Sequence, residues 1–353
     1  MNGWRNIGAM GGARMCYRRP MLRGRVELPI LESRLLAGNV LGDPAEREVL
    51  VYLPPSYDGT KRFPVLWVLP PYAAGHRSML NYKCWEPGLF ERYEALLSTG
   101  AAAEAILVSP DCMTRWGGSQ FLDSAATGPY QRYLVEEVLP FVDARYRTIP
   151  EREARAVVGR SSGGFGALRL AIDRPEAFAV YGSHAGDAAF EASIRPSFTS
   201  AAITLQLAGG VAAFLERFAE KGPRSGGDFE AIMTIATAAC YAPEPDAPFP
   251  HAALPFDLET ALPVPAVWER WLAHDPVVRL DAQPEAMRDA AYVFLDAGDR
   301  DEHGLQIGAR MVRDRLAARG VRVTHEEFPG GHRGTAWRYD VSIPLLLAEV
   351  ARA

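Results

Sequence analysis

The chain has 353 residues, of which 48% are hydrophobic and 23% charged, and it carries a formal net charge of −5 at pH 7. This composition is that of an ordinary globular protein and excludes a chain that is disordered throughout. A nucleic-acid-binding protein must neutralise phosphates with clustered Lys and Arg, so the acidic balance and the lack of a basic stripe exclude that class as well.

The first 23 residues contain five arginines and no acidic residue, and we expect them to form a flexible tail ahead of one domain over residues 24–353. The pair Arg18-Arg19 superficially resembles a twin-arginine export signal, but charged residues follow it where that signal needs an apolar stretch. The chain has no run of about 18 apolar residues, and its four cysteines lack the spacing of a metal or redox site. These features predict a cytoplasmic protein with reduced thiols and no membrane span.

Short apolar runs alternate with segments of helical periodicity along the domain, which predicts an α/β fold with a mostly parallel sheet covered by helices on both faces. Strands are predicted over residues 25–31, 47–53, 64–69, 105–109, 154–159, 179–183, 291–295 and 321–328. Helices are predicted over residues 86–97, 130–146, 163–173, 306–319 and 343–351. A turn-rich stretch separates the first two strands, which allows them to pair as an antiparallel edge.

Residues 190–275 interrupt this alternation. They contain many prolines and the bulky aromatic residues Phe249, Phe256, Trp268 and Trp271. A structureless loop of this length is rare in a compact domain unless it is functional. We therefore predict a cap inserted over the carboxyl edge of the sheet, which shapes a substrate pocket, with Trp268 as a candidate substrate contact.

The segment Gly159-Arg160-Ser161-Ser162-Gly163 lies between a predicted strand and a predicted helix and matches the pattern G-x-S-x-G. In this motif the nucleophilic serine occupies a strained strand-to-helix turn, where side chains two positions away on either side would collide. Only Ser161 has glycine at both of these positions, so it is the candidate nucleophile. A glycine-rich structural turn, or a phosphate-binding turn, is the alternative.

A serine hydroxyl needs a general base, and in folds with this motif the base follows the nucleophile and the acid along the chain. Six histidines lie downstream of Ser161. His332 follows the last predicted strand in a Gly-Gly-His loop, where a base is required, and is the candidate. His325 lies within that strand and is expected to face the surface, whereas His303 is expected to begin a helix.

The acid of a triad should follow the preceding core strand, and Asp301 does so with the G-x-x-D spacing that lets a turn direct its carboxylate at the imidazole. There it would hold the tautomer of the ring and stabilise the imidazolium. Asp299, Glu302 and Asp187 are alternatives for this role. Asp187, which follows the strand over residues 179–183, is also a candidate substrate contact.

Ester cleavage also needs donors for the oxyanion. One candidate is the backbone N–H of Ser162 at the start of its helix. The second should come from the loop after the strand over residues 64–69, where two prolines precede Tyr72. Because proline has no N–H, Tyr72 offers the first available amide and Ala73 the alternative.

With these motifs the chain resembles the putative-esterase family of α/β hydrolases, which includes enterochelin esterases, S-formylglutathione hydrolase, feruloyl esterases and mycolyltransferases. The resemblance extends from about Gly24 to the C-terminus. It rests on residues 51–57, 159–164, 298–302 and 330–334. It implies an α/β-hydrolase fold, catalytic roles for Ser161, Asp301 and His332, and no metal or organic cofactor.

Two further features relate to this family. Many members carry His-Gly where this chain has Pro70-Pro71, which puts the shape of the oxyanion loop in question. The loop over residues 116–121 resembles family loops near the pocket, so Trp116 and Gln120 are candidate substrate contacts, with a surface turn as the equal alternative.

The predicted reaction is the hydrolysis of a small-molecule carboxylic ester through an acyl-enzyme. The alternatives are transfer of the acyl group to an alcohol or amine, cleavage of an amide, and a catalytically silent hydrolase fold that serves as a binding module. A homo-oligomer is compatible with the sequence, and no nucleic-acid or membrane partner is expected.

Overall fold

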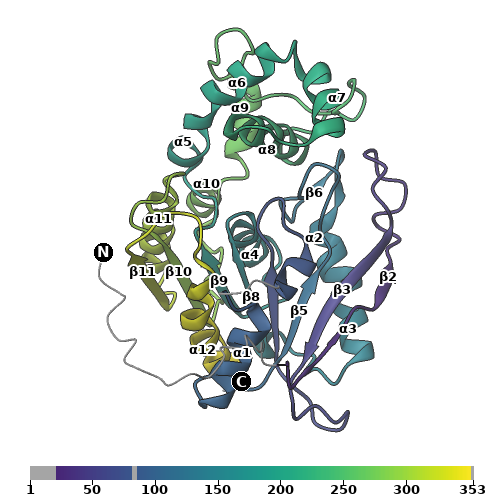
Figure 1. Ribbon diagram of the computed structural model, residues 1–353. Helices are drawn as coiled ribbons and strands as arrows, with labels where there is room; N and C mark the ends of the chain where they lie inside the picture. Colours follow the sequence, from purple (N-terminus) through teal and green to yellow (C-terminus); the bar gives the residue numbers. More distant parts are fainter. Residues whose placement is uncertain (1–20, 82–85, 351–353) are drawn as a thin grey trace, which may run out of the picture.

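The computed structural model describes residues 21–81 and 86–350 (Figure 1). Residues 1–20 of the predicted tail and the predicted end of the last helix at Ala351 lie outside the described residues. The backbone amides of Arg23 and Gly24 both donate to the carboxylate of Glu94, at 2.8 Å to its Oε1. Residue 23, which we expected in the tail, is therefore held against the domain.

Within the described residues, the centre of the molecule is a mixed nine-stranded sheet with the order β1-β3-β5-β4-β8-β9-β10-β11, with β2 also paired to β3. Its strands are β1 (Arg25–Glu27), β2 (Ile30–Glu32), β3 (Glu46–Leu53), β4 (Val65–Leu69), β5 (Ile106–Pro110), β8 (Arg155–Arg160), β9 (Val180–His184), β10 (Tyr292–Gly298) and β11 (Val323–Phe328). A small ribbon of β6 (Asp123–Ser124) and β7 (Gly128–Pro129) stands apart.

The predicted strands are all present, and their directions follow the expectation. In the large sheet β3 is antiparallel to β1, β2 and β5, whereas neighbouring strands in the order β5-β4-β8-β9-β10-β11 are parallel. The first predicted strand is divided into β1 and β2 around Pro29, which cannot donate a backbone hydrogen bond to a ladder. The prediction of an antiparallel edge is confirmed.

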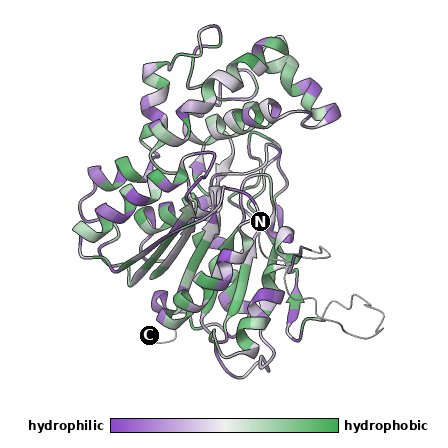
Figure 2. Cartoon of the chain, turned by 60° about the vertical axis from the view of Figure 1, so that its left-hand side comes forward, coloured by the Kyte–Doolittle hydropathy of each residue, from purple (hydrophilic) through white to green (hydrophobic). Residues whose placement is uncertain are grey.

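Helices cover both faces of this sheet, as the continuous apolar strands require. Val65, Trp67 and Leu69 of β4 pack into the core on one face, and Leu66 and Val68 pack into the core on the other. The first face is covered by α2 (Tyr130–Arg132), the π-helical turn Tyr133–Val138, α3 (Leu139–Arg145), α4 (Ser162–Asp173), α10 (Pro276–Ala282) and α11 (Leu305–Ala318). The second is covered by α1 (Leu89–Ser98) and α12 (Tyr339–Val350). Figure 2 shows the apolar strands between these more polar helices.

A separate helical layer lies above the carboxyl end of the parallel strands (Figure 1). It consists of α5 (Phe190–Ser193), α6 (Phe198–Leu207), α7 (Val211–Lys221), α8 (Gly226–Tyr241) and α9 (Pro265–Leu272). These helices fall within the stretch for which the sequence predicts a cap, and we call this layer the cap. Its own core contains the packed rings of Phe198, Phe256, Trp268 and Trp271.

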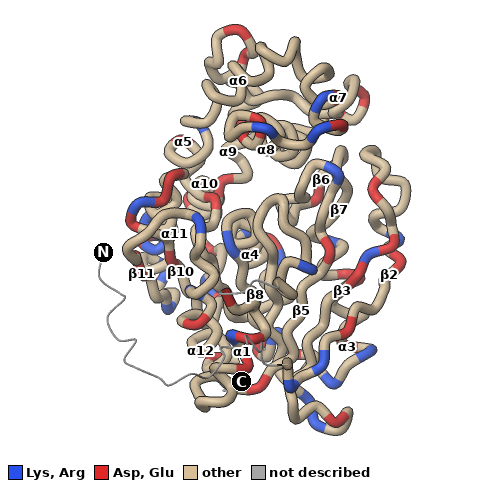
Figure 3. The backbone as a smooth tube through the Cα atoms, in the orientation of Figure 1, with Lys and Arg blue, Asp and Glu red and all other residues tan. Residues whose placement is uncertain are grey.

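Among the described helices, none alone has the length and apolarity that a membrane span requires. The bent pair formed by Phe190–Leu207 and Val211–Lys221 meets the requirement only when its two segments are taken together. Acidic and basic residues are interspersed along the described elements (Figure 3).

Candidate active site

The candidate nucleophile lies on a strained turn at the carboxyl edge of the sheet. β8 ends at Arg160, α4 begins at Ser162, and Ser161 between them has φ +56° and ψ −123°. A non-glycine residue with positive φ is energetically unfavourable and persists only where its surroundings hold it. The N–H of Ser161 donates to the carbonyl of His184 at 2.8 Å, and its own carbonyl accepts the N–H of Phe165 at 2.9 Å.

The two motif glycines are required by close backbone contacts. A Cβ atom on Gly159 would lie 2.2 Å from the carbonyl carbon of Gly163, and a Cβ on Gly163 would lie 2.1 Å from the carbonyl oxygen of Leu69. Backbone atoms cannot yield as the end of a flexible side chain can. The strand, the turn and the oxyanion loop can therefore approach one another only with glycine at both positions.

The three residues predicted as a triad meet at this edge. His332 Nε2 lies 3.1 Å from Ser161 Oγ, and His332 Nδ1 lies 2.9 Å from Asp301 Oδ2. The side chain of Asp301 is fully buried, and its Oδ1 also accepts the backbone N–H of His303 at 2.9 Å. Because an ionised carboxylate only accepts, Nδ1 carries the proton and Nε2 is left to accept one from the serine.

Hydrogen bonds and charge interactions keep Asp301, the candidate acid, ionised. Burial by itself raises the pKa of Asp301, but the hydrogen bond to His332 and the amide of His303 outweigh it, so the pKa stays below its ordinary value. The carboxylate is consequently negative at neutral pH, where it can stabilise a positive imidazole ring.

Two of the alternative acids, Glu302 and Asp299, accept hydrogen bonds from backbone amides of the loop that carries His332 and not from its imidazole ring. Glu302 Oε2 accepts the backbone N–H of His332 at 2.7 Å, and Asp299 Oδ1 accepts the N–H of Gly330 at 3.0 Å. Asp187 lines the pocket but makes no hydrogen bond with another described residue. Of the four candidates, Asp301 has the contact with the imidazole ring that the predicted role needs.

Ser162 and Tyr72, whose amides are the candidate oxyanion donors, both line the cavity beside Ser161. Ser162 is the first residue of α4, and the first amides of a helix have no acceptor within it. The amide of Ala73 donates to the carbonyl of Gly117 at 2.8 Å and is therefore not free, whereas the amide of Tyr72 has no acceptor among the described residues. The hydroxyl of Tyr72 donates to the carbonyl of Trp116 at 2.6 Å and anchors this loop.

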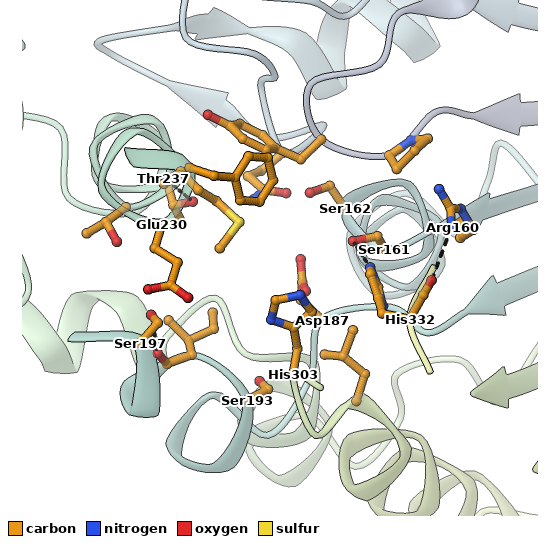
Figure 4. Close-up of a pocket in the computed structure, with 18 of the residues that line it drawn as sticks. Arg160, Ser161, Ser162, Asp187, Ser193, Ser197, Glu230, Thr237, His303 and His332 are labelled. Carbon is orange, nitrogen blue, oxygen red and sulfur yellow. Dashed lines mark hydrogen bonds between the residues drawn. The ribbon is translucent and has the colours of Figure 1, made fainter. Parts of the chain in front are cut away.

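A cavity of about 430 Å³ separates the sheet edge from the cap, and Ser161 and His332 line it (Figure 4). One face of α8 forms its roof. The residues on that face follow the spacing of a single helical stripe: Phe229, Glu230, Met233, Thr234 and Thr237.

Of the predicted substrate contacts, Gln120 and Asp187 line this cavity, as does Tyr72. Trp268 and Trp116 are not among the residues that line it, and their role as substrate contacts stays a prediction. Trp268 is packed in the core of the cap, where its Nε1 donates to Glu191 at 2.7 Å. The ring of Trp116 is buried against Phe249 instead.

Sequence reasoning missed several residues of the cavity. Trp271, one helical turn after Trp268, lines it, as does His303, whose ring lies edge-on to that of His332 at 5.0 Å. His303 precedes α11, so the expectation that it begins a helix is wrong. His325 is not surface-facing either, because its side chain is 8% exposed beneath neighbouring side chains. The stripe on α8 was detectable as a periodicity, but nothing in it pointed to the active site.

No group of three or more His, Cys, Asp or Glu side chains in the described part of the chain could hold a metal ion.

Asp187 has a pKa raised to about 6 by burial, which the neighbouring His332 only partly offsets. Burial likewise lowers the pKa of His303.

Comparison with known proteins places these features in a family. The sequence model of the family described as "Putative esterase" matches residues 44–343, most of the chain. Esterase Rv1288 and Esterase MT1326, both of Mycobacterium tuberculosis, are each 40% identical over 67 residues. That match spans 18% of this chain and only 15% of the length of either relative.

The likeness to solved structures extends over more than nine tenths of the chain. A ferulic acid esterase has a TM-score of 0.60 at 19% identity, with 93% of this chain and 99% of that one covered. An S-formylglutathione hydrolase from Agrobacterium tumefaciens has a TM-score of 0.57 at 15% identity (94% and 98% covered). FphF, a fluorophosphonate-binding serine hydrolase of Staphylococcus aureus, has a TM-score of 0.55 at 15% identity, with 93% of this chain and 98% of that one covered. These likenesses confirm the α/β-hydrolase fold.

Proposed function

We propose that this chain, which belongs to the putative esterase family, is a carboxylic ester hydrolase that cleaves its ester through an acyl-enzyme formed on Ser161. One observation carries the proposal above all others. A continuous hydrogen-bond chain runs from Ser161 Oγ through both nitrogens of His332 to the buried carboxylate of Asp301, with links of 3.1 Å and 2.9 Å.

In the first half of the reaction, His332 Nε2 takes the proton of Ser161 as the serine oxygen attacks the ester carbonyl. The imidazolium that forms is stabilised by Asp301. The amides of Ser162 and Tyr72 donate to the developing oxyanion, each such donor being worth about 10²–10³-fold in rate. His332 then returns the proton to the leaving alcohol, and the acyl group remains on the serine.

In the second half, His332 removes a proton from a water molecule that attacks the acyl carbonyl, and the same two amides stabilise the second oxyanion. Collapse of this intermediate releases the carboxylic acid and restores the hydroxyl of Ser161. Each group therefore acts twice, and the chain of hydrogen bonds returns to its starting state after each turnover.

The nucleophile is tested by Ser161→Ala, which removes the attacking oxygen and leaves the fold intact. We expect hydrolysis of p-nitrophenyl butyrate to fall at least about 10³-fold, with unchanged circular dichroism and Tm. Ser98→Ala, on an exposed part of α1 far from the cavity, is the matched control and should keep full activity. A Ser161→Ala protein that hydrolyses the ester near the wild-type rate would refute the proposal.

Two further measurements separate the alternatives. A fluorophosphonate that labels Ser161 in the wild-type protein indicates an activated nucleophile, whereas the silent binding module would leave the serine unlabelled. Product analysis with an added alcohol distinguishes hydrolysis from acyl transfer, because a transferase forms the new ester even though water is in large excess.

A further inference from the structure

Two carboxylates of the active-site cavity have no partner among the described residues. Asp187 comes from the loop after β9 and Glu230 from α8, and neither forms a hydrogen bond or an ion pair with another described residue. Figure 4 shows Glu230 across the cavity from Ser161 and His332, with Asp187 in the space between. One oxygen of Glu230 is buried and lacks any donor.

Three of the hydroxyl groups that line the same cavity are already committed as donors and cannot satisfy these carboxylates. Ser193, Ser197 and Thr237 each donate their single proton to a backbone carbonyl three to five residues earlier, at 2.9, 2.7 and 2.7 Å. Only the lone pairs of these oxygens remain for a molecule in the cavity. The wall therefore offers mostly hydrogen-bond acceptors.

A second, independent feature of the cavity agrees with this. Gln120 is 5% exposed, lines the cavity, and its Oε1 has no donor among the described residues. Trp271, which is 1% exposed, lines the same space, and its Nε1 is a donor without an acceptor among the described residues. Buried acceptors normally have partners in a folded protein. The unpaired oxygen of Gln120 therefore points to a bound group that donates a hydrogen bond.

The two arginines of the cavity lie on its catalytic side. Arg160 donates to the carbonyl of His332 at 3.2 Å, beside the catalytic loop and away from the cap (Figure 4). Arg333, which also lines the cavity, is exposed to solvent on that same loop. Burial lowers the pKa of His303, which favours its neutral form, and raises that of Asp187 to about 6. Neither carboxylate forms an ion pair with these or other described residues, although buried carboxylates normally have such a partner.

We propose that the acceptor wall formed by Asp187, Glu230, Gln120, Ser193, Ser197 and Thr237 is a subsite for a cationic N–H donor, a primary ammonium or guanidinium group on the ester substrate. Such a group supplies donors and positive charge together. A neutral polyol would bring donors without the positive charge that two carboxylates favour, and a quaternary ammonium would bring charge without a donor. The inference rests on the proposed function, since it assigns the substrate class of that same site.

The test is competition for Ser161 at constant ionic strength, because it does not depend on which side of the ester carries the charge. We expect hexylammonium to slow fluorophosphonate labelling at concentrations at least about tenfold lower than 1-hexanol or hexyltrimethylammonium do, the difference of a charge-assisted hydrogen bond. Glu230→Gln should reduce this selectivity by about tenfold. Glu216→Gln, an exposed position on α7 in the outer part of the cap (Figure 3), removes the same charge and should leave the selectivity unchanged.

Binding is followed in parallel by the Tm of the unlabelled protein, which a ligand of the native state raises. Hexylammonium should raise the Tm of the wild-type protein more than hexanol does, and this difference should shrink in Glu230→Gln. Equal effects of the amine and the alcohol in both measurements, or full selectivity in Glu230→Gln, would overturn the inference. Absence of labelling at Ser161 would instead contradict the proposed function, and the Tm measurement would still decide on the subsite.

Discussion

Gly163→Ala tests how the fold of this chain creates its active site. The added Cβ would lie 2.1 Å from the carbonyl oxygen of Leu69, 2.7 Å from its carbonyl carbon and 2.8 Å from the carbonyl oxygen of Pro70. Ordinary contacts begin at 3.4 Å, so the end of β4 and the start of α4 must separate by about 1 Å, which core overpacking data associate with a loss of about 3 kcal/mol.

This separation is expected to act on catalysis as well as on stability, because the two amides proposed to bind the oxyanion lie on its two sides. Tyr72 belongs to the loop that follows β4, and Ser162 begins α4. A misplacement of about 1 Å in an active site can lower the rate about 10²-fold. We therefore expect Gly163→Ala to lose both about 3 kcal/mol of unfolding free energy and about two orders of magnitude in kcat/KM.

Urea unfolding and initial rates on p-nitrophenyl butyrate measure the two effects. Gly226→Ala is the matched control, since its Cβ would meet nothing within 4 Å and its φ is not positive. At the start of α8 this substitution should leave stability unchanged or raise it by up to about 1 kcal/mol. A Gly163→Ala protein with wild-type midpoint and wild-type rate would show that the close backbone contact does not shape the site.

Two further predictions concern buried charge. Burial places the pKa of Asp187 at about 6, above the 3.8 of an unperturbed carboxyl, so folding favours its protonated form. Wild-type stability should fall relative to Asp187→Asn as pH rises from about 4 through 6, by at most about 3 kcal/mol because partial exposure screens the charge. A constant difference in unfolding free energy between the wild-type protein and Asp187→Asn from pH 4 to 8 would contradict this. Arg338 donates from Nε to the fully buried Asp296 at 2.6 Å, and Arg338→Ala should lower the unfolding free energy by about 3–5 kcal/mol. Arg322→Ala removes a more exposed arginine that pairs with Glu349, and it should lower the unfolding free energy by less than about 1 kcal/mol. Equal losses in the two variants would show that burial of the Arg338–Asp296 pair does not increase its contribution.

Much of the fold was predictable because its signals are local. A strand buried on both faces must be apolar along its length, and β4, β8 and β10 are recognisable from that alone. The candidate triad was also within reach, because chain order and the loop after each parallel strand determine where a nucleophile, an acid and a base can meet. The contact of His332 with Ser161 brings together residues 171 positions apart.

Other features depended on how elements turn toward one another. Trp268 and Trp271 are equivalent in the sequence of α9, and the rotation of that helix alone decides that the second faces the cavity. The amide of Ala73 looked as free as that of Tyr72 until the fold brought Gly117 against it.

The sequence by itself thus determined the α/β class, the strained turn at Ser161 and the chain order of the candidate triad, because each of these follows from residue type and near neighbours. Only the tertiary structure decided which side chains share the cavity. Asp187 and Glu230 belong to different layers of the molecule, and their lack of partners is a property of the space between those layers. No local pattern encodes that space, since it arises from the packing of segments that are distant along the chain.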